Sequence, residues 1–118
     1  MDEVEIKKYV DTVKALERIR GNAKLFKMLL THFLDTRGQV DQLKQEISAN
    51  DRQAAAKSVH AIKGVAANLS MTALYELCPP FEVLLKTDED AAELMAAFQE
   101  TYEKTLTCVN HLLANPPA

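Results

Sequence analysis

The feature that most constrains the fold is the stretch from Ser58 to Leu69, whose apolar residues recur at the spacing of an amphipathic helix. Extended back to Gln53, one side of this helix carries residues suited to a protein core: Ala55, Val59, Ile62, Val65, Ala66 and Leu69. The opposite stripe, roughly 120° wide, has one imidazole, two lysines and little that is bulky: Gln53, Ala56, Lys57, His60, Lys63, Gly64 and Ala67. The stretch therefore predicts a helix whose outer face leaves one histidine accessible.

Gly64 lies about one turn after His60 in this predicted helix. A glycine inside a helix costs about 1 kcal/mol relative to alanine, so we expect a compensating role. The missing side chain exposes one flank of the imidazole, and Lys63 can bring an ammonium close to an anion attached to the ring. An exposed nucleophile, an adjacent cation and free approach together indicate a phosphoryl acceptor.

The pattern His60-x-x-Lys63-Gly64, followed by Ala66-Ala67-Asn68-Leu69, closely resembles the motif of the histidine-containing phosphotransfer (HPt) domains of bacterial phosphorelays. Leu16-Glu17-Arg18-Ile19 with Gly21-Asn22 resembles the entry to the second helix of that family. Leu74-Tyr75-Glu76-Leu77-Cys78 resembles the helix after the motif. Roughly residues 10 to 113 fit the plan of the family.

The resemblance implies a phosphorelay carrier. His60 would accept a phosphoryl group from the aspartate of a receiver domain and pass it to another receiver aspartate. Lys63 would offset the charge of the phosphate, with Lys57 as a second candidate for the same role. Gly64 would leave space for the receiver, together with two small residues on the same stripe, Ala56 and Ala67.

Two further polar residues enter through the resemblance. Asn68 matches the family pattern, although its place near the helix end suits turn chemistry. Glu82 stands, by its offset from the motif, where family members often place a polar residue near the phosphorylatable ring. It would then accept a hydrogen bond from the imidazole and hold its tautomer. The alternative is an ordinary surface glutamate, since Pro79-Pro80 just before it leave its direction open.

Composition and length limit the class of protein. A chain of 118 residues suits one domain, so we expect a single HPt-like helical domain over residues 1–118. A net charge of −3 argues against a nucleic-acid-binding module. No apolar run approaches the roughly 20 residues of a membrane span, and the acidic opening does not resemble a signal peptide. We therefore expect no membrane insertion and a cytoplasmic location.

The predicted architecture is all-α, because no stretch shows strand alternation bounded by turn signals. We expect an antiparallel up-and-down four-helix bundle with an additional short N-terminal helix. Ser70 is a candidate cap for the fourth helix at Met71, and Pro79-Pro80 should kink or restart it. The expected helices cover about residues 3–18, 23–48, 51–69, 71–85 and 87–113.

The second predicted helix carries more apolar residues than one core stripe needs. One stripe consists of Leu25, Leu29, Phe33, Val40, Leu43 and Ile47. A second stripe, rotated by about 100°, consists of Phe26, Leu30 and Leu34. The second stripe either packs on the first helix or forms a partner-docking patch around Leu30 and Leu34. Equal rise from the turn at Asn50 places His60 beside the region of Arg37, which would then join the docking surface.

No nucleotide-binding loop is visible, so the chain is not expected to be an ATP-dependent kinase or to bind a cofactor. The expected partners are response-regulator receiver domains, which would bring Mg²⁺, and a sensor histidine kinase, hybrid or separate. A monomer is expected. Two alternatives stay open: a degenerate adaptor that binds partners without carrying phosphate, and a plain helical scaffold. Cys78 and Cys108 are expected to be buried thiols, and structural or solvent roles are expected for His32 and His111.

Overall fold

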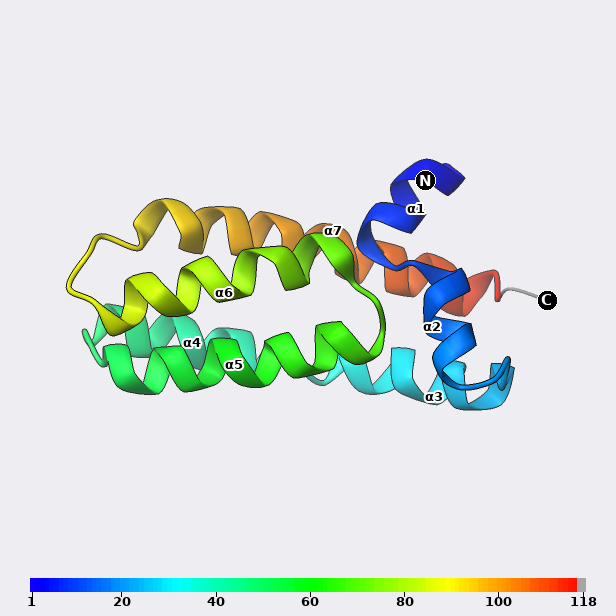
Figure 1. The fold of residues 1–118 in the computed structure, drawn as a ribbon, viewed down its shortest axis with the longest axis horizontal. Helices are drawn as coiled ribbons and strands as arrows, with labels where there is room; N and C mark the ends of the chain where they lie inside the picture. Colours follow the sequence, from blue (N-terminus) through cyan, green and yellow to red (C-terminus); the bar gives the residue numbers. More distant parts are fainter. Residues whose placement is uncertain (117–118) are drawn as a thin grey trace.

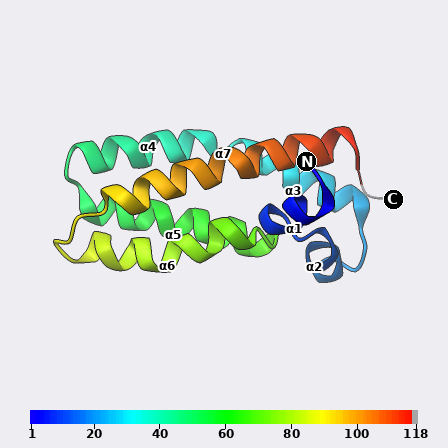
Figure 2. The ribbon, with the colours of Figure 1, turned by 90° about the horizontal axis from the view of Figure 1, so that it is seen from above.

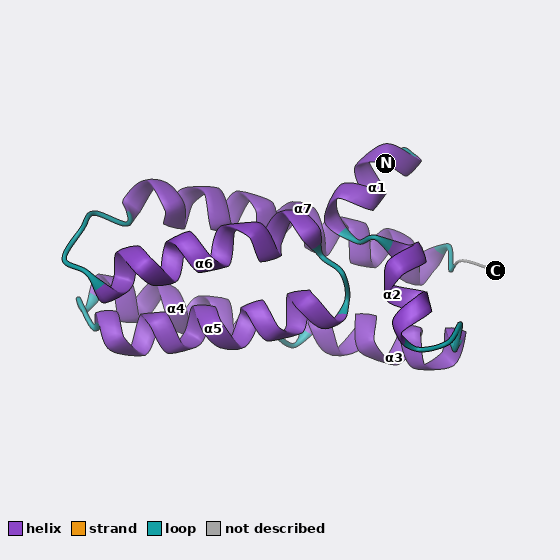
Figure 3. Ribbon diagram, in the orientation of Figure 1, coloured by secondary structure: helices purple, strands orange, loops and turns teal. Residues whose placement is uncertain are grey.

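The computed structural model describes residues 1–116, which are helical with no strand (Figure 3). The all-α expectation is therefore confirmed. Seven helices lie within these residues: α1 (Glu3–Tyr9), α2 (Thr12–Arg18), α3 (Ala23–Leu34), α4 (Arg37–Ser48), α5 (Arg52–Asn68), α6 (Thr72–Lys86) and α7 (Ala92–Ala114).

The molecule is elongated, with extents of 46 × 23 × 20 Å. α5 and α6 lie side by side along the long axis, α4 packs on α5, and α7 packs on α6 (Figures 1 and 2). α3 packs chiefly against α7, while α1 contacts α6 and α7 and α2 contacts α3. The two short N-terminal helices thus lie at the same end of the molecule as the end of α7 (Figure 1).

Aromatic rings from three helices form the middle of the core. The ring centroids of Phe33 and Tyr102 are 5.5 Å apart, and those of Phe81 and Phe98 are 5.6 Å apart. Phe98 also stacks on Tyr102 at 6.4 Å. Each such pair contributes about 0.5–1.5 kcal/mol beyond the burial of its area. These contacts hold α3, α6 and α7 together around one interior.

The first expected helix is two helices, so the prediction of one continuous helix over residues 3–18 is wrong. Val10 adopts an extended conformation and is fully buried, and Asp11 caps α2 by accepting a hydrogen bond from the backbone N–H of Lys14. The Asp11 N–H also donates to the carbonyl of Ser70 in the turn between α5 and α6. The break therefore places Val10 in the core and ties this segment to the bundle.

The second expected helix is also divided, at Asp35 and Thr36. Both residues keep right-handed helical dihedrals, but the Thr36 hydroxyl is buried and bonds to the Phe33 carbonyl and to the Tyr102 hydroxyl, 2.7 Å away. In α3 the buried side chains are Phe26, Leu30 and Phe33, and in α4 they are Val40 and Leu43. The division changes which stripe of α3 faces the core.

This change corrects the docking prediction for Leu30. Leu30 is only 1% exposed and belongs to the main core, so it offers no surface to a partner. Leu34 is half-buried and packs against the same core. Leu25 and Leu29, which the periodicity assigned to the core stripe, are instead half-buried.

The expected restart at Pro79-Pro80 is wrong, because α6 continues through both prolines to Lys86. The carbonyls left without an intrahelical N–H partner belong to Tyr75 and Glu76. Both residues are exposed, so water can reach their carbonyl groups. The prolines thus lie where the loss of two backbone hydrogen bonds destabilises α6 least, because water can replace the missing N–H donors.

Two expected helix starts also differ. Ser70 has a left-handed backbone, with φ of 50°, and Met71 occupies the N-cap of α6 without a side-chain hydrogen bond. The predicted cap at Ser70 is therefore wrong, because the left-handed conformation that this residue adopts suits a turn rather than a helix N-cap. α7 begins at Ala92 rather than Thr87, with the Asp90 carboxylate accepting from the Ala92 N–H. α7 ends at Ala114, and the sequence Asn115-Pro116-Pro117 that follows favours a helix stop there, although Pro117 lies outside the described residues.

Cys78 and Cys108 are both buried free thiols, as expected. Burial raises the pKa of Cys78 to about 12 and that of Cys108 to about 11. None of the helices in residues 1–116 is long and apolar enough to cross a membrane.

The corrected position of Leu30 gives a stability prediction. Leu30→Ala should lower the free energy of unfolding by about 2–5 kcal/mol, because it removes a buried side chain and leaves a cavity. Met28 on the same helix is 53% exposed, and Met28→Ala should change the free energy by no more than about 0.5 kcal/mol. Urea unfolding followed by circular dichroism measures both. Equal losses for the two variants would contradict the burial of Leu30.

Candidate functional site

α5 presents the histidine-bearing face. Asp51 caps this helix by accepting from the Ala54 N–H, and the buried side of the helix consists of Ala55, Ala56, Val59, Ile62 and Ala66. His60, Lys57 and Gly64 lie on the exposed side. The His60 side chain is 70% exposed even though it sits in the middle of a helix packed on two neighbours.

A carboxylate on α6, that of Glu82, contacts two side chains of α5, those of His60 and Lys63. The His60 Nδ1 lies 2.9 Å from Oε1 of Glu82, and the Lys63 Nζ donates to Oε2 of the same residue at 2.7 Å. The Glu82 side chain is only 8% exposed. One buried carboxylate therefore has each of its oxygens engaged by a different residue of α5.

The charge state of this group follows from its partners. Burial alone would raise the pKa of Glu82, but the hydrogen bonds from Lys63 and His60 outweigh burial and lower that pKa below its usual value. The hydrogen bond that Lys63 donates to Glu82 correspondingly raises the pKa of the Lys63 ammonium. Glu82 is thus an ionised carboxylate at neutral pH, and an ionised carboxylate only accepts hydrogen bonds.

This acceptor selects one tautomer of His60. Because Glu82 can only accept, the Nδ1 of His60 must carry the hydrogen that joins them. In the neutral ring the other nitrogen, Nε2, is then unprotonated and has a free lone pair. Since most of the side chain is exposed, this arrangement presents a nucleophilic nitrogen to an incoming molecule.

Glu82 reaches His60 because α6 is unbroken and packs extensively on α5. Its neighbours Cys78, Phe81 and Leu85 are buried, and they fix the face of α6 that meets α5. Glu82 lies at the edge of that face, where its carboxylate can turn toward His60 and Lys63.

Arg52, which the sequence did not single out, fastens the other end of this helix pair. Its guanidinium donates to the backbone carbonyls at the end of α6 and just beyond it, those of Leu84, Leu85, Thr87 and Glu89. The carbonyls of Leu84 and Leu85 lie in the last turn of α6 and have no intrahelical N–H partner, so a cation is favourable there. The contact fixes the first turn of α5 against the last turn of α6. It thereby helps to hold Glu82 opposite His60.

A hollow of about 880 Å³ opens beside His60, between the first half of α5 and the last half of α6. Its floor includes Ala56 and Leu85, and its walls carry charged side chains from both helices and from the loop after α6: Arg52, Lys57, Glu82, Lys86 and Asp88. Lys86 and Asp88 carried no sequence signal beyond their place at a helix end. Ala56 is only 5% exposed, so its small size deepens the hollow rather than providing contact area.

Gly64 is not required by the packing of this chain. A Cβ built on Gly64 meets no atom within 4 Å, and the same holds for Gly38 in the first turn of α4. No contact within the chain therefore requires a glycine at position 64. Open space lies over this part of the α5 face, next to His60. Ala67, one turn further along, is half-buried.

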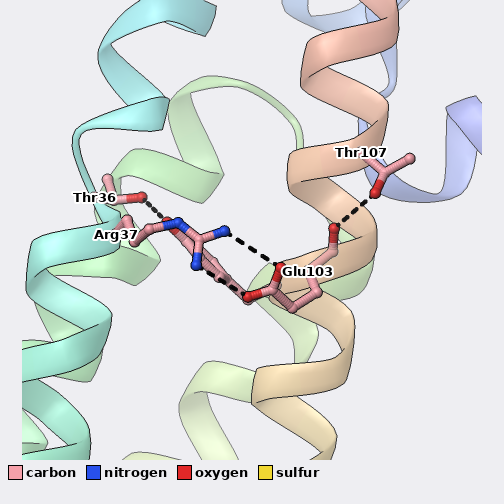
Figure 4. A network of polar contacts seen from close by, with 5 residues as sticks. Thr36, Arg37, Glu103 and Thr107 are labelled. Carbon is pink, nitrogen blue, oxygen red and sulfur yellow. Dashed lines mark hydrogen bonds and ion pairs between the residues drawn. The ribbon is translucent and has the colours of Figure 1, made fainter.

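Arg37, predicted to belong to the docking surface, pairs with an acidic side chain on α7. Its guanidinium meets the carboxylate of Glu103 on α7 at 3.3 Å (Figure 4), and both side chains are about half exposed. An exposed pair of this kind contributes at most about 1 kcal/mol. This pair joins α4 to α7, and the place of Arg37 in the docking surface beside His60 stays a prediction. Asn68 is the last residue of α5, two turns beyond His60.

His32 and His111 lie on other helices and take no part in the cluster around Glu82. Among residues 1–116, no group of three or more His, Cys, Asp and Glu side chains is placed to hold a metal ion.

A family model described as the Hpt domain matches residues 27–113. The matched region runs from within α3 to near the end of α7 and includes His60, Lys63, Gly64 and Glu82. The first two helices lie outside it. Neither a search of curated proteins nor a search of solved structures found a match to the chain.

The three glycines of the chain should respond differently to alanine. Gly64→Ala and Gly38→Ala should each raise the free energy of unfolding, by about 0.4–1 kcal/mol, because each enters a helix without a clash. Gly21 has a φ of +74°, which an alanine adopts only with strain. Gly21→Ala should therefore lower the free energy of unfolding by about 1 kcal/mol or more. Urea unfolding of the three variants checks this order. Destabilisation by Gly64→Ala would show that the glycine has a packing role.

Proposed function

This chain belongs to the Hpt domain family, and from that premise we propose that it is a phosphorelay carrier. His60 accepts a phosphoryl group from the aspartate of one receiver domain and passes it to the aspartate of another. The observation that carries the proposal is the pairing of an exposed imidazole with a buried carboxylate at its Nδ1. That pairing leaves Nε2 free to act as the nucleophile.

The transfer step uses few groups of this chain. Nε2 of His60 attacks the phosphorus of the aspartyl phosphate, the N–P bond forms, and the P–O bond breaks to release the aspartate carboxylate. Delivery to the next receiver reverses these bond changes. Phosphoryl transfer depends mainly on positioning and charge compensation. Lys63 and Lys57 supply positive charge on this side, and Mg²⁺ is expected on the receiver domain rather than on this chain.

The approach of the receiver follows from the surface around His60. The open space over Gly64 lets a partner backbone come close to the ring, and Ala67 continues this low surface along α5. On α6, Tyr75 is 41% exposed and Val83 is 59% exposed. Both are exposed apolar side chains on the helix that carries Glu82, so we propose that they replace Leu30 as the apolar part of the docking surface. Leu34 stays a weaker candidate for docking because it is half-buried.

The wider assignment follows the family. The partners are response-regulator receiver domains and a sensor histidine kinase, and the chain acts as a carrier without kinase activity of its own. The architecture is an antiparallel up-and-down four-helix bundle, in which α3 and α4 together form one member and α1 and α2 replace the short N-terminal helix. We assign the domain a cytoplasmic location and a monomeric state.

The alternatives of a degenerate adaptor and a plain scaffold are less well supported. A scaffold has no use for an ionised carboxylate buried beneath an exposed histidine, since burying a charge is costly unless it is paired. An adaptor has no use for a nucleophilic Nε2. The carrier explains both features together with Gly64.

The direct test is phosphate acceptance by His60→Gln. The variant should keep its helical circular dichroism but accept no phosphoryl group from a panel of phosphorylated receiver domains, because the nucleophile is gone. His32→Gln and His111→Gln should accept phosphate at the parent rate, since neither contacts Glu82. Acid-labile phosphate on the His60→Gln protein would contradict the proposal. Its absence from the parent with every receiver would favour the adaptor.

A further inference from the structure

We propose that Glu82 keeps a proton on Nδ1 of His60 throughout the phosphorylation cycle, which makes the phosphorylated domain a reactive donor rather than a stable store of phosphate. This inference rests on the proposed function of His60. It adds the charge state of the phosphorylated ring, and it assigns to Glu82 a role in releasing the phosphoryl group as well as in accepting it.

The first step is a count of protons on the ring. Before transfer, Nδ1 carries a hydrogen and Nε2 carries a lone pair. When Nε2 uses that lone pair to bind phosphorus, the ring becomes a cation that still has the hydrogen on Nδ1. If this cation then loses the hydrogen to water, Nδ1 gains a lone pair that faces Oε1 of Glu82 across 2.9 Å. Two acceptors would then oppose each other at hydrogen-bond distance, which disfavours the loss.

The second step is that Glu82 does not take the proton itself. Its other oxygen accepts a hydrogen bond from the Lys63 ammonium at 2.7 Å, and this partner favours the ionised carboxylate. Proton transfer from the ring to Glu82 would place a neutral carboxyl group beside a half-buried ammonium. Lys63 therefore acts on the ring through Glu82, as a positioning residue.

The other charged groups around the ring do not outweigh this contact. Cations line the same hollow on α5 and α6, and they oppose additional positive charge on the imidazole: Arg52, Lys57 and Lys86. Asp88 in the loop after α6 favours it. On α4, the Glu46 carboxylate accepts from Ser58 and is engaged there. Glu82 is the charged group that meets the ring at hydrogen-bond distance, and a direct contact dominates over screened charges further away.

The consequence is chemical. When the N–P bond of the cationic ring breaks, the leaving group is neutral imidazole with its hydrogen still on Nδ1. From a neutral phosphorylated ring, the leaving group would be the imidazole anion, which is far less stable. Retaining the proton therefore accelerates transfer of the phosphoryl group to the next aspartate. It also accelerates the slower hydrolysis of the phosphorylated ring by water. It also means that no proton has to enter or leave the ring during either transfer.

The experiment uses the full chain with His32→Gln and His111→Gln, which leaves His60 as the single histidine. Potassium phosphoramidate phosphorylates the ring as its own P–N bond breaks and ammonia leaves, so no receiver is needed. The ¹⁵N shifts of the phosphorylated ring are then followed against pH in this parent, in Glu82→Gln and in Glu76→Gln. Glu76 is an exposed carboxylate on the same helix and serves as the matched control.

We expect the ring of Glu82→Gln to lose its Nδ1 proton at a pH about one unit lower than the ring of the parent, because the opposite charge is gone from a partly solvated site. At a pH above the titration midpoints of both proteins, Glu82→Gln should lose its phosphate to water up to about tenfold more slowly than the parent. Glu76→Gln should match the parent in both measurements.

Equal midpoints in the parent and Glu82→Gln would overturn the inference, as would an equal shift in Glu76→Gln. Failure of the proposed function would look different. In that case, the chemically phosphorylated parent would transfer its phosphate to no receiver domain, whatever the titration of its ring.

Discussion

The contact on which the site depends is the double hydrogen bond at Glu82. A buried carboxylate is unfavourable unless both its charge and its oxygens find partners. His60 and Lys63, three residues apart on α5, supply one partner for each oxygen. The arrangement works only if α5 and α6 keep a fixed register. The hydrogen bonds of Arg52 at the end of α6 and the buried residues around Glu82 both serve that register.

Much of the fold could be predicted from the sequence because helix positions depend on local features, namely the spacing of apolar residues and the capping residues. The helical periodicity around His60 separated the buried from the exposed face of α5 except at Ala56, which was assigned to the outer stripe and is buried. Asn22 and Asp51, which cap α3 and α5, are residue types that favour the N-cap position. The breaks at Val10 and Thr36 were not predictable, since each is stabilised by contacts distant in sequence. Thr36 bonds to Tyr102 on α7, and Val10 fills a place in the core. The error at Leu30 followed from the second break, which changed the buried stripe of α3.

The site was predictable to a similar degree. His60, Lys63 and Gly64 stood out because small residues around an exposed histidine are unusual in a helix face. Glu82 could be named only through a family resemblance, and its direction depended on whether Pro79-Pro80 broke the helix. They do not, because the carbonyls that lose their partners lie on the exposed side of α6. Arg52 and the hollow beside His60 arise from packing of two helices and leave no trace in either one alone.

The central claim is that Glu82 selects the tautomer that exposes a nucleophilic Nε2. The most direct measurement is a long-range ¹H–¹⁵N correlation spectrum of the unphosphorylated protein, recorded at a pH where the His60 ring is neutral. Our account predicts that Nδ1 carries the hydrogen and that Nε2 has the shift of an unprotonated ring nitrogen. A ring with the hydrogen on Nε2, the form that free histidine prefers in water, would contradict it.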